Sequence, residues 1–362
     1  MPATARLTGE WTGPRFRAPD QVVPQDWPKL AAHLATHGHA LDLAAPPRQF
    51  AGGFGNLNYL LTIDGAPWVL RRPPLGPIPP GANDMAREHL VLTKLSPRLA
   101  LVPKPLHFSA DISVLGAPFL IMEYRPGLVI GGDLPDGLDS RAVGPSLSEQ
   151  LVRFLADLHA IAPASVGLDT FAKPDGFLER AVAGWAKRAT IALDGAAPTA
   201  LGEIVGWLRD RPPPTGDVTL LHNDFKLDNL VLDPATLAPV AVLDWDMGSR
   251  GDPLFDVGTT LSYWTEAGDP ACMHRIHQMP TALPGFWTRA EALAHYARLT
   301  GRDVTQFKFY RVLTLFKLAV VFLQIDARKR TGGPVDARLA GLAGVGEELL
   351  DFTVDAIRRQ DP

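Results

Sequence analysis

The chain has 362 residues, of which 46% are hydrophobic and 20% are charged, enough for two or three globular units with sizeable cores. Its 35 Lys and Arg residues stand against 39 Asp and Glu residues, which gives a formal net charge of −4. A chain without a basic excess is not expected to bind nucleic acid in general. The one cysteine, Cys272, excludes a disulfide within the chain and a multi-cysteine zinc site, and this usage fits the reducing cytosol.

Neither a targeting signal nor a membrane span is expected. The first 21 residues are polar and interrupted by proline and glycine, unlike a signal peptide. The most apolar stretch, residues 313–325, contains Lys317 and Gln324 and is shorter than the ~18–20 residues that span a bilayer. We therefore expect a cytoplasmic protein that has no membrane contact and buries this stretch as a helix.

The N-terminal third is predicted to mix helices and strands. A helix is expected to begin near Trp27, and residues 59–63 and 68–71 form a β-hairpin around the Asp64-Gly65 turn. The glycine-rich residues 51–58 stand at the head of this hairpin. A helix across residues 85–95 and strands near 106–109 and 117–124 follow.

Most later segments are predicted to be helical, for example the amphipathic residues 148–161. Short apolar runs at 219–221, 230–232 and 240–243 are the exceptions. The pattern indicates an α+β protein in which a small β-rich unit precedes a larger, mostly helical one.

The densest polar cluster lies between the first two of these apolar runs. Asp224 is followed five residues later by Asn229, which is the spacing of a kinase catalytic loop. In such a loop the Asp accepts the proton of the attacking hydroxyl and the Asn is a ligand of Mg²⁺. Lys226 could offset charge that develops on a transferred phosphoryl group. His222 is expected to orient Asp224 rather than to act as the base.

A second cluster follows the third apolar run, where Asp244 ends a strand fifteen residues after Asn229. Mg²⁺ prefers carboxylate and amide oxygens together with phosphates. One Asn with one or two Asp residues therefore predicts a nucleotide-metal site.

The glycine-rich hairpin is the third element, because backbone N–H groups can approach phosphates only where side chains are small. A cation on the returning strand, Arg71 or Arg72, would meet the phosphates, and Glu88 on the following helix would hold that cation.

Each element taken alone has a less specific interpretation. A glycine-rich segment is more often a flexible turn, and an Arg–Glu pair is usually a surface ion pair. The His/Asp cluster could also belong to a metallohydrolase, although it offers no second His at ligand spacing. The order and intervals of all five elements match a kinase, which favours the functional interpretation.

These segments resemble the aminoglycoside phosphotransferase family of the protein-kinase-like superfamily, in particular the branch of the kinase domains of acyl-CoA dehydrogenase family members 10 and 11. The resemblance runs from about residue 47 to residue 330 and rests on the glycine-rich segment, the catalytic-loop and metal motifs, and aromatic motifs around 262–264 and 309–319.

The resemblance implies a bilobal fold with ATP and Mg²⁺ in the cleft, and divides the chain into an N-terminal arm and helix (1–44), an N-lobe (45–125) and a C-lobe (126–362). Asp224 matches the catalytic base, Asn229 and Asp244 match the magnesium ligands, and Asp256 matches an Asp that braces the catalytic loop. The remaining residues implied at the nucleotide are in the glycine-rich loop, the clamp and the hinge: Gly53, Phe54, Gly55, Asn56, Arg71, Glu88, Glu123 and Arg125.

The chain departs from the family pattern at two positions. The usual His-Gly-Asp is His-Asn-Asp at residues 222–224, and the strand lysine is replaced by Arg71. The planar fork of arginine is not equivalent to an ammonium. Whether Arg71 or Arg72 meets the phosphates is left open by the sequence.

The acceptor is expected to be a small molecule with a hydroxyl group. Residues 251–362 contain 13 acidic and 13 basic residues, whereas a pocket for polycationic aminoglycosides should be acidic. The sequence therefore predicts an ATP-dependent phosphotransferase for a non-cationic acceptor, and the branch resemblance implies a hydroxyacyl thioester. The alternatives are an aminoglycoside kinase, a nucleotide-binding pseudokinase and a metal-dependent phosphoesterase. The sequence does not set the oligomeric state.

Overall fold

A computed structural model describes residues 13–52, 55–76, 83–196, 198–214, 216–330 and 341–359. The described residues form two compact units. The sheet unit contains residues up to 129 together with 229–248, and the helical unit contains 130–228 and the residues after 248. The division of the chain at residues 44 and 125 stays a prediction.

The sheet unit is built on a five-stranded antiparallel sheet with the order β1-β2-β3-β5-β4. Asp64 and Gly65 connect β2 to β3 with φ values of 51° and 76°, a turn whose positive φ angles explain the Asp-Gly pair. The strands are β1 (Arg48–Gln49), β2 (Leu57–Ile63), β3 (Ala66–Arg72), β4 (Pro105–Ser109) and β5 (Phe119–Glu123).

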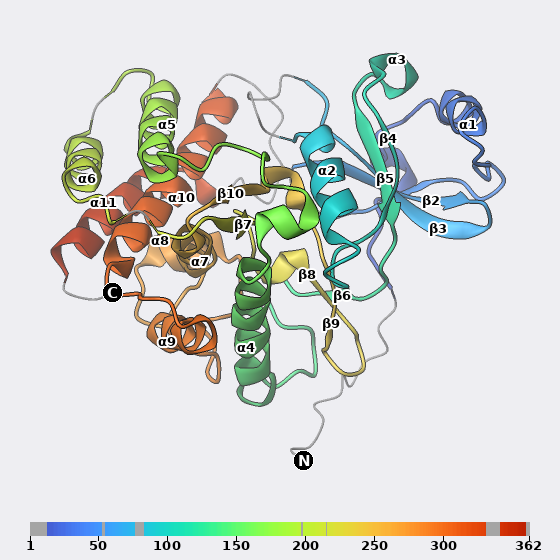
Figure 1. Cartoon of the computed structure of the whole chain (residues 1–362). Helices are drawn as coiled ribbons and strands as arrows, with labels where there is room; N and C mark the ends of the chain where they lie inside the picture. Colours follow the sequence, from blue (N-terminus) through green and yellow to red (C-terminus); the bar gives the residue numbers. More distant parts are fainter. Residues whose placement is uncertain are drawn as a thin grey trace. The chain divides into compact units, whose positions relative to one another are not determined.

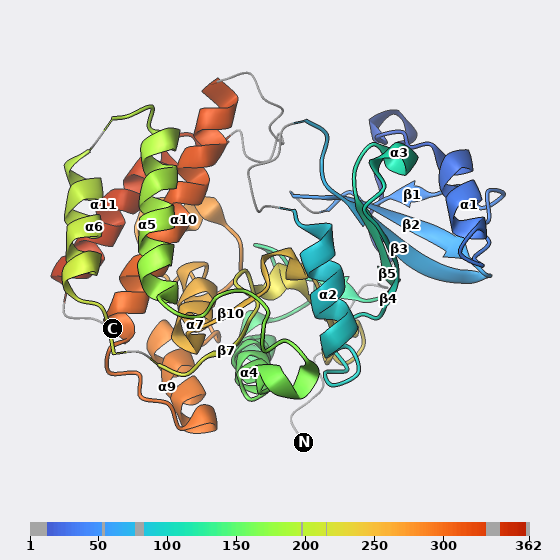
Figure 2. The same ribbon diagram turned by 45° about the horizontal axis from the view of Figure 1, so that its top comes forward.

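Helices cover both faces of this sheet (Figure 1). On one face, α1 (Trp27–Ala35) and α3 (Ile112–Leu115) pack over a core that includes Tyr59 and Phe119. On the other face lies α2 (Met85–Leu95), and the turned view in Figure 2 agrees. Asp26 and Asp84 cap the N-termini of α1 and α2 by accepting from backbone N–H groups.

A second, three-stranded sheet belongs to the same unit and has the order β6-β8-β9. Its strands are β6 (Leu128–Val129), β8 (Leu230–Leu232) and β9 (Pro239–Val242), and the 3₁₀ turn η4 (Trp245–Met247) follows β9. Leu230 pairs with Val242, and one residue further the Leu243 N–H donates to the carbonyl of Asn229 at 2.9 Å. This register places Asn229 and Asp244 at the same end of the hairpin.

In the helical unit, α10 (Phe307–Arg330) is buried along most of its length and packs against four other helices, α5, α6, α7 and α11. Strand β7 (Thr219–Leu221) pairs with β10 (Ser249–Gly251) and delivers the polar segment that begins at His222. The helices are α4 (Ser140–His159), α5 (Phe177–Ala192), α6 (Thr199–Asp210), α7 (Pro253–Ser262), α8 (Ala271–Ile276), α9 (Arg289–Thr300), α10 (Phe307–Arg330) and α11 (Val345–Arg358).

The predicted elements are found with small shifts of their ends. The helix expected over 148–161 begins earlier, at Ser140, and continues through Pro145. Leu90, an apolar residue in the helix predicted at 85–95, is 38% exposed. In the part of the chain that the structure describes, no helix combines the length and apolar character needed to cross a bilayer, and the stretch at 313–325 is the middle of buried α10.

Candidate active site

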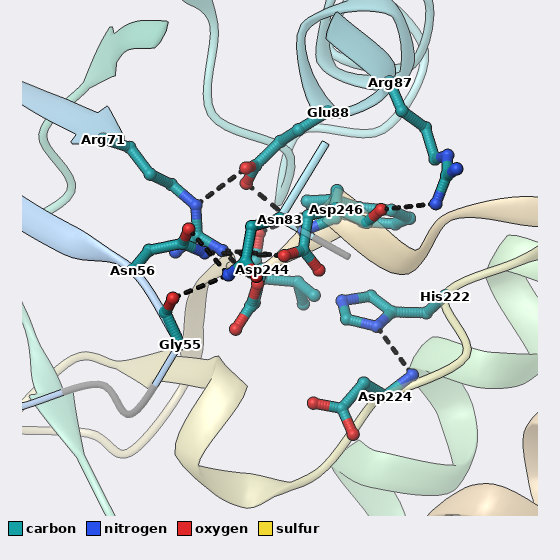
Figure 3. A network of polar contacts seen from close by, with 12 residues as sticks. Gly55, Asn56, Arg71, Asn83, Arg87, Glu88, His222, Asp224, Asp244 and Asp246 are labelled. Carbon is teal, nitrogen blue, oxygen red and sulfur yellow. Dashed lines mark hydrogen bonds and ion pairs between the residues drawn. The ribbon is translucent and has the colours of Figure 1, made fainter. Parts of the chain in front are cut away.

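The carboxylate of Asp224 is held by two donors of the helical unit. Lys226 Nζ lies 2.8 Å from Asp224 Oδ2, and the hydroxyl of Tyr263, the residue directly after α7, donates to Oδ1 at 3.0 Å. The backbone N–H of Asp224 donates to His222 Nδ1 at 3.3 Å, as Figure 3 shows. His222 is fully buried, and through this contact it helps to orient the loop.

A second carboxylate, Asp256 on α7, fixes the backbone of the same loop. Its two oxygens accept the backbone N–H groups of His222 and Asn223, both at 2.7 Å. His159 Nε2 lies 3.3 Å from the carboxylate, and His159 Nδ1 contacts the Tyr296 hydroxyl at 2.7 Å. Burial acts to raise the pKa of Asp256, but these hydrogen bonds and the nearby histidines outweigh it and lower the pKa. This is the bracing contact that the family resemblance implied.

The departure from His-Gly-Asp has a conformational explanation. Asn223 has φ of 65°, in the left-handed region where glycine is favoured and where asparagine is the most tolerated alternative. The asparagine side chain also donates to Ser249 Oγ at 2.7 Å. The substitution therefore keeps the backbone geometry of the loop and adds a tie to β10.

The electrostatics of this cluster keep Asp224 ionised. Burial acts to raise the pKa of Asp224, but the ammonium groups of Lys226 and Lys317 outweigh it, and the pKa is lowered. Lys317, on buried α10, donates to the backbone carbonyl of Asn223. Burial lowers the pKa of Lys317 to about 8. The lysine is thus a buried part of the loop's support.

In the sheet unit, the two neighbouring arginines point to opposite faces of β3 and contact different groups. Arg71 Nε donates to Glu88 Oε2 at 2.7 Å and Nη2 contacts Asp244 Oδ1 (Figure 3). Arg72 instead donates to Gln25 Oε1 at 2.6 Å and to the backbone carbonyl of Leu115, the last residue of α3. Arg71 therefore joins the predicted cluster, and Arg72 ties the sheet to its α1 face.

Acidic groups outnumber the cation around Arg71. Besides Glu88 and Asp244, Asp246 Oδ2 lies 3.9 Å from Arg71 Nη2. Burial acts to lower the pKa of Arg71, but the three carboxylates outweigh it and raise the pKa, so the guanidinium stays charged. Asn229 lies at the same end of the β8–β9 hairpin as Asp244. The three carboxylates outnumber the guanidinium of Arg71, and their hard oxygen atoms are donors of the kind that Mg²⁺ prefers.

The glycine-rich segment is described only in part, since Gly53 and Phe54 lie outside the described residues. Gly55 and Asn56 are linked by Asn83, whose amide donates to the Gly55 carbonyl at 2.6 Å and to Asn56 Oδ1 at 3.0 Å. Asn56 Nδ2 in turn lies 3.4 Å from Asp246 Oδ2. Gly55 and Asn56 are therefore connected to the acidic cluster through hydrogen bonds of their own and of Asn83 (Figure 3).

The predicted hinge lies at the end of β5. The side chains of Glu123 and Arg125 form an ion pair of 2.9 Å. The Glu123 N–H donates to the Lys104 carbonyl at 2.8 Å, so this backbone donor is used inside the protein.

Three contributors were not recognised as site residues from the sequence: Tyr263, Asp246 and Arg87, whose guanidinium donates to the Asp246 carbonyl at 3.0 Å. Asp246 stands two residues after Asp244, so the sequence placed a second carboxylate next to the predicted ligand. Tyr263 lies 39 residues from Asp224, and nothing local to either residue indicates their contact.

Comparisons with known proteins agree with this geometry. Residues 47–299 match the model of a family described as the phosphotransferase enzyme family. Acyl-CoA dehydrogenase family member 11 of Gallus gallus is 30% identical over 299 residues, which cover 79% of this chain and 37% of that protein. Acyl-CoA dehydrogenase family member 10 of Mus musculus is 30% identical over 312 residues, which cover 85% of this chain and 29% of that protein. The chain thus spans less than half the length of these curated relatives.

Solved structures show the same fold. A putative aminoglycoside phosphotransferase from Ralstonia eutropha is 25% identical with a TM-score of 0.73, covering 92% of this chain and 99% of that one. A macrolide 2′-phosphotransferase of type I has a TM-score of 0.57 at 18% identity, covering 92% and 98%. The predicted α+β, bilobal protein-kinase-like fold is confirmed. The chain belongs to the phosphotransferase enzyme family, as its motifs predicted.

Proposed function

We propose that this phosphotransferase moves the γ-phosphoryl group of Mg-ATP to the hydroxyl of a small, non-cationic acceptor. One observation carries the proposal. In a loop with kinase spacing, Asp224 is kept ionised by Lys226 and fixed by Tyr263, while Asp256 holds the loop's backbone. An aspartate that only ended a strand at the surface would need neither these contacts to its carboxylate nor a buried carboxylate to hold its backbone.

In the proposed reaction, the acceptor hydroxyl gives its proton to an oxygen of Asp224 as its own oxygen forms a bond to the γ-phosphorus. The bond between that phosphorus and the β–γ bridging oxygen breaks, and ADP leaves with the electron pair. Lys226 offsets negative charge on the transferred group. His222 keeps the backbone at Asp224 in place and acts as a positioning residue.

The acidic cluster of the sheet unit is proposed to hold the nucleotide's magnesium. Asn229 and Asp244 would be the protein ligands, and their hard oxygens and excess negative charge fit the ion. When bound, Mg²⁺ neutralises charge on the phosphates. Arg71 uses two of its five N–H donors on Glu88 and Asp244, and the remaining donors suit phosphate oxygens.

The remaining nucleotide contacts are proposed from the family pattern. Backbone groups of the glycine-rich segment, Gly53, Phe54, Gly55 and Asn56, would approach the phosphates, and the Glu123 carbonyl with the Arg125 N–H would hold the adenine edge. A related fold supports nucleotide binding: the hygromycin-complexed phosphotransferase APH(4)-Ia, 16% identical, is described as a ternary complex with AMP-PNP.

The acceptor class is proposed from charge and from relatives. Residues 251–362 carry equal numbers of acidic and basic residues, which does not favour a polycation. The relatives named above are acyl-CoA dehydrogenase family members, and a phosphotransferase segment within such proteins fits a hydroxyacyl thioester. Most aromatic residues of the region 251–362, such as Trp264 and Phe316, belong to the core. Phe286 and Trp287 are half-buried.

The test is ADP formation from Mg-ATP against a panel of hydroxyacyl thioesters, aminoglycosides, choline and sugars, with transfer of the γ-phosphoryl group followed by mass spectrometry. Acceptor-dependent ADP together with a phosphorylated thioester supports the proposal. Turnover of aminoglycosides alone overturns the acceptor class. ATP binding without turnover on the panel favours the pseudokinase, and phosphate release without an acceptor favours the phosphoesterase.

A further inference from the structure

Three histidines gather on the α1 side of the sheet unit, away from the acidic cluster. His33 lies on α1, His37 follows the end of that helix by two residues, and His107 lies on β4. One ring nitrogen from each lies within 4.8 Å of the others. Because α1 and α2 cover opposite faces of the sheet, this cluster and the Arg71–Glu88 pair lie on opposite faces as well (Figures 1 and 2).

The spacing of the three rings matches what a metal ion requires. His33 Nε2 and His107 Nε2 are 2.9 Å apart, and the ring centroids of His37 and His107 are 4.6 Å apart. Tetrahedral zinc with Zn–N bonds of about 2.0–2.1 Å places its nitrogens roughly 3.3–3.4 Å from each other. Side-chain rotations that change the distances between the nitrogens by up to about 1.5 Å would bring them to this spacing.

The orientation of His37 is fixed in the way that metal-binding histidines are usually fixed. Its Nδ1 lies 2.9 Å from the His33 carbonyl and 3.1 Å from Thr36 Oγ1. A ring that donates Nδ1–H to a backbone carbonyl presents the lone pair of Nε2, and such an outer contact is the common support of a metal-ligating histidine. His33 and His37 are four residues apart in one helical turn, so both rings face β4.

Two of the three rings have an aromatic neighbour. His33 and His107 pack on Phe119, with ring centroids 5.7 and 6.0 Å away. This packing helps to fix the positions of both rings, whose neutral form is the one that binds a metal.

We propose that His33, His37 and His107 form a binding site for a divalent transition-metal ion of the zinc class, which ties α1 to β4. Three imidazole nitrogens suit Zn²⁺ and its neighbours and do not suit Mg²⁺, which prefers oxygen. Water completes the coordination, since His37 is exposed. The ion would stabilise the attachment of α1 to the sheet, and the site is independent of the proposed phosphoryl transfer.

The test is a calorimetric titration of the chelator-treated full chain with Zn²⁺ in the presence of excess Mg²⁺. The visible spectrum is then recorded after Co²⁺ replaces Zn²⁺. We expect one Zn²⁺ per chain and a rise of Tm with Zn²⁺. His37→Ala, at an exposed position that leaves the core intact, should weaken binding by at least about 100-fold, because one of three ligands is lost. His107→Gln should do the same.

The matched control is His89→Gln. His89 is a half-buried histidine of α2 that stacks on Phe108 at 5.3 Å and does not belong to the cluster. The His89→Gln variant should bind Zn²⁺ with the affinity of the wild type. The proposal is overturned if the wild type binds no Zn²⁺, if His37→Ala keeps wild-type affinity, or if His89→Gln loses as much affinity as His37→Ala.

Discussion

The two polar clusters of the molecule both combine carboxylates with cations but carry different charge balances. In the sheet unit, Glu88, Asp244 and Asp246 surround the guanidinium of Arg71. In the helical unit, Asp224 is surrounded by the ammonium groups of Lys226 and Lys317 and by the Tyr263 hydroxyl; Lys226 also lies 3.4 Å from Asp228.

The difference indicates what each cluster can hold. An excess of carboxylates attracts a cation, whereas a carboxylate flanked by ammonium groups stays ionised, as a proton acceptor must be. Asp224 belongs to the helical unit, and Asn229, five residues later, belongs to the sheet unit. Variants that change one balance and leave the other intact separate the two roles.

The largest effect is expected for Asp224→Asn. The amide cannot accept the acceptor's proton, so we expect kcat to fall by roughly 10²–10⁴-fold, while the Kd for Mg-ATP changes by less than about threefold. Steady-state turnover and calorimetry measure the two quantities. Asp233→Asn, in the exposed turn before β9, is the control and should keep full activity. Full turnover by Asp224→Asn would exclude this residue as the base.

Asp256→Ala is expected to cost about 3–5 kcal/mol of unfolding free energy, because two buried backbone N–H groups lose their acceptor. Asp256→Asn, which keeps one carbonyl oxygen, should lose less. Since the pKa of Asp256 is lowered on folding, its contribution is present above the unfolded-state pKa and disappears as pH falls through the folded-state value. Denaturant titrations at neutral and acid pH should therefore show the wild type and Asp256→Ala converging in acid; a constant difference would contradict this assignment.

The neighbouring arginines offer a matched pair. Arg71→Met should raise the KM for ATP by about 10–100-fold, because a charge-assisted contact to phosphate is lost. Arg71→Lys, which restores the family's ammonium, should recover part of the affinity. Arg72→Met should lower thermal stability and leave the affinity of the folded protein for ATP nearly unchanged. Equal losses of affinity in Arg71→Met and Arg72→Met would show that the effect is structural.

The smallest effect is a displacement of the pH profile. Lys317→Met removes one of the charges that lower the pKa of Asp224, so the acid limb of kcat/KM should move to higher pH. Leu318→Met, a neighbouring core change on α10 without loss of charge, should leave the limb in place. An unchanged limb in Lys317→Met would mean that Lys226 alone sets the ionisation of Asp224.

The fold was predictable where local patterns dominate. The Asp64-Gly65 turn and the helix at 85–95 follow from turn chemistry, an N-terminal cap and apolar spacing. Strands β1 and β6 were not predicted, because each contains two residues and is defined only by its partner strand. The choice between Arg71 and Arg72 also needed the structure, since it depends on which face of β3 each side chain occupies.

The candidate site was predictable to the extent that its residues are close in sequence. The catalytic-loop spacing and the Asp244 motif are local, whereas the contact of Tyr263 with Asp224 and the approach of His107 to His33 are tertiary. His33 and His37 are four residues apart, at and just beyond the end of α1, and the third histidine is supplied only by the folded sheet.

The central claim is tested most directly by calorimetric titration of the wild type and Asp244→Asn with ATP, with and without Mg²⁺. We predict that the wild type binds ATP and that Mg²⁺ increases its affinity. Because Asp244 belongs to the proposed metal site, Asp244→Asn should lose this Mg²⁺-dependent increase. Absence of ATP binding to the wild type, or an equal effect of Mg²⁺ on both proteins, would contradict the account.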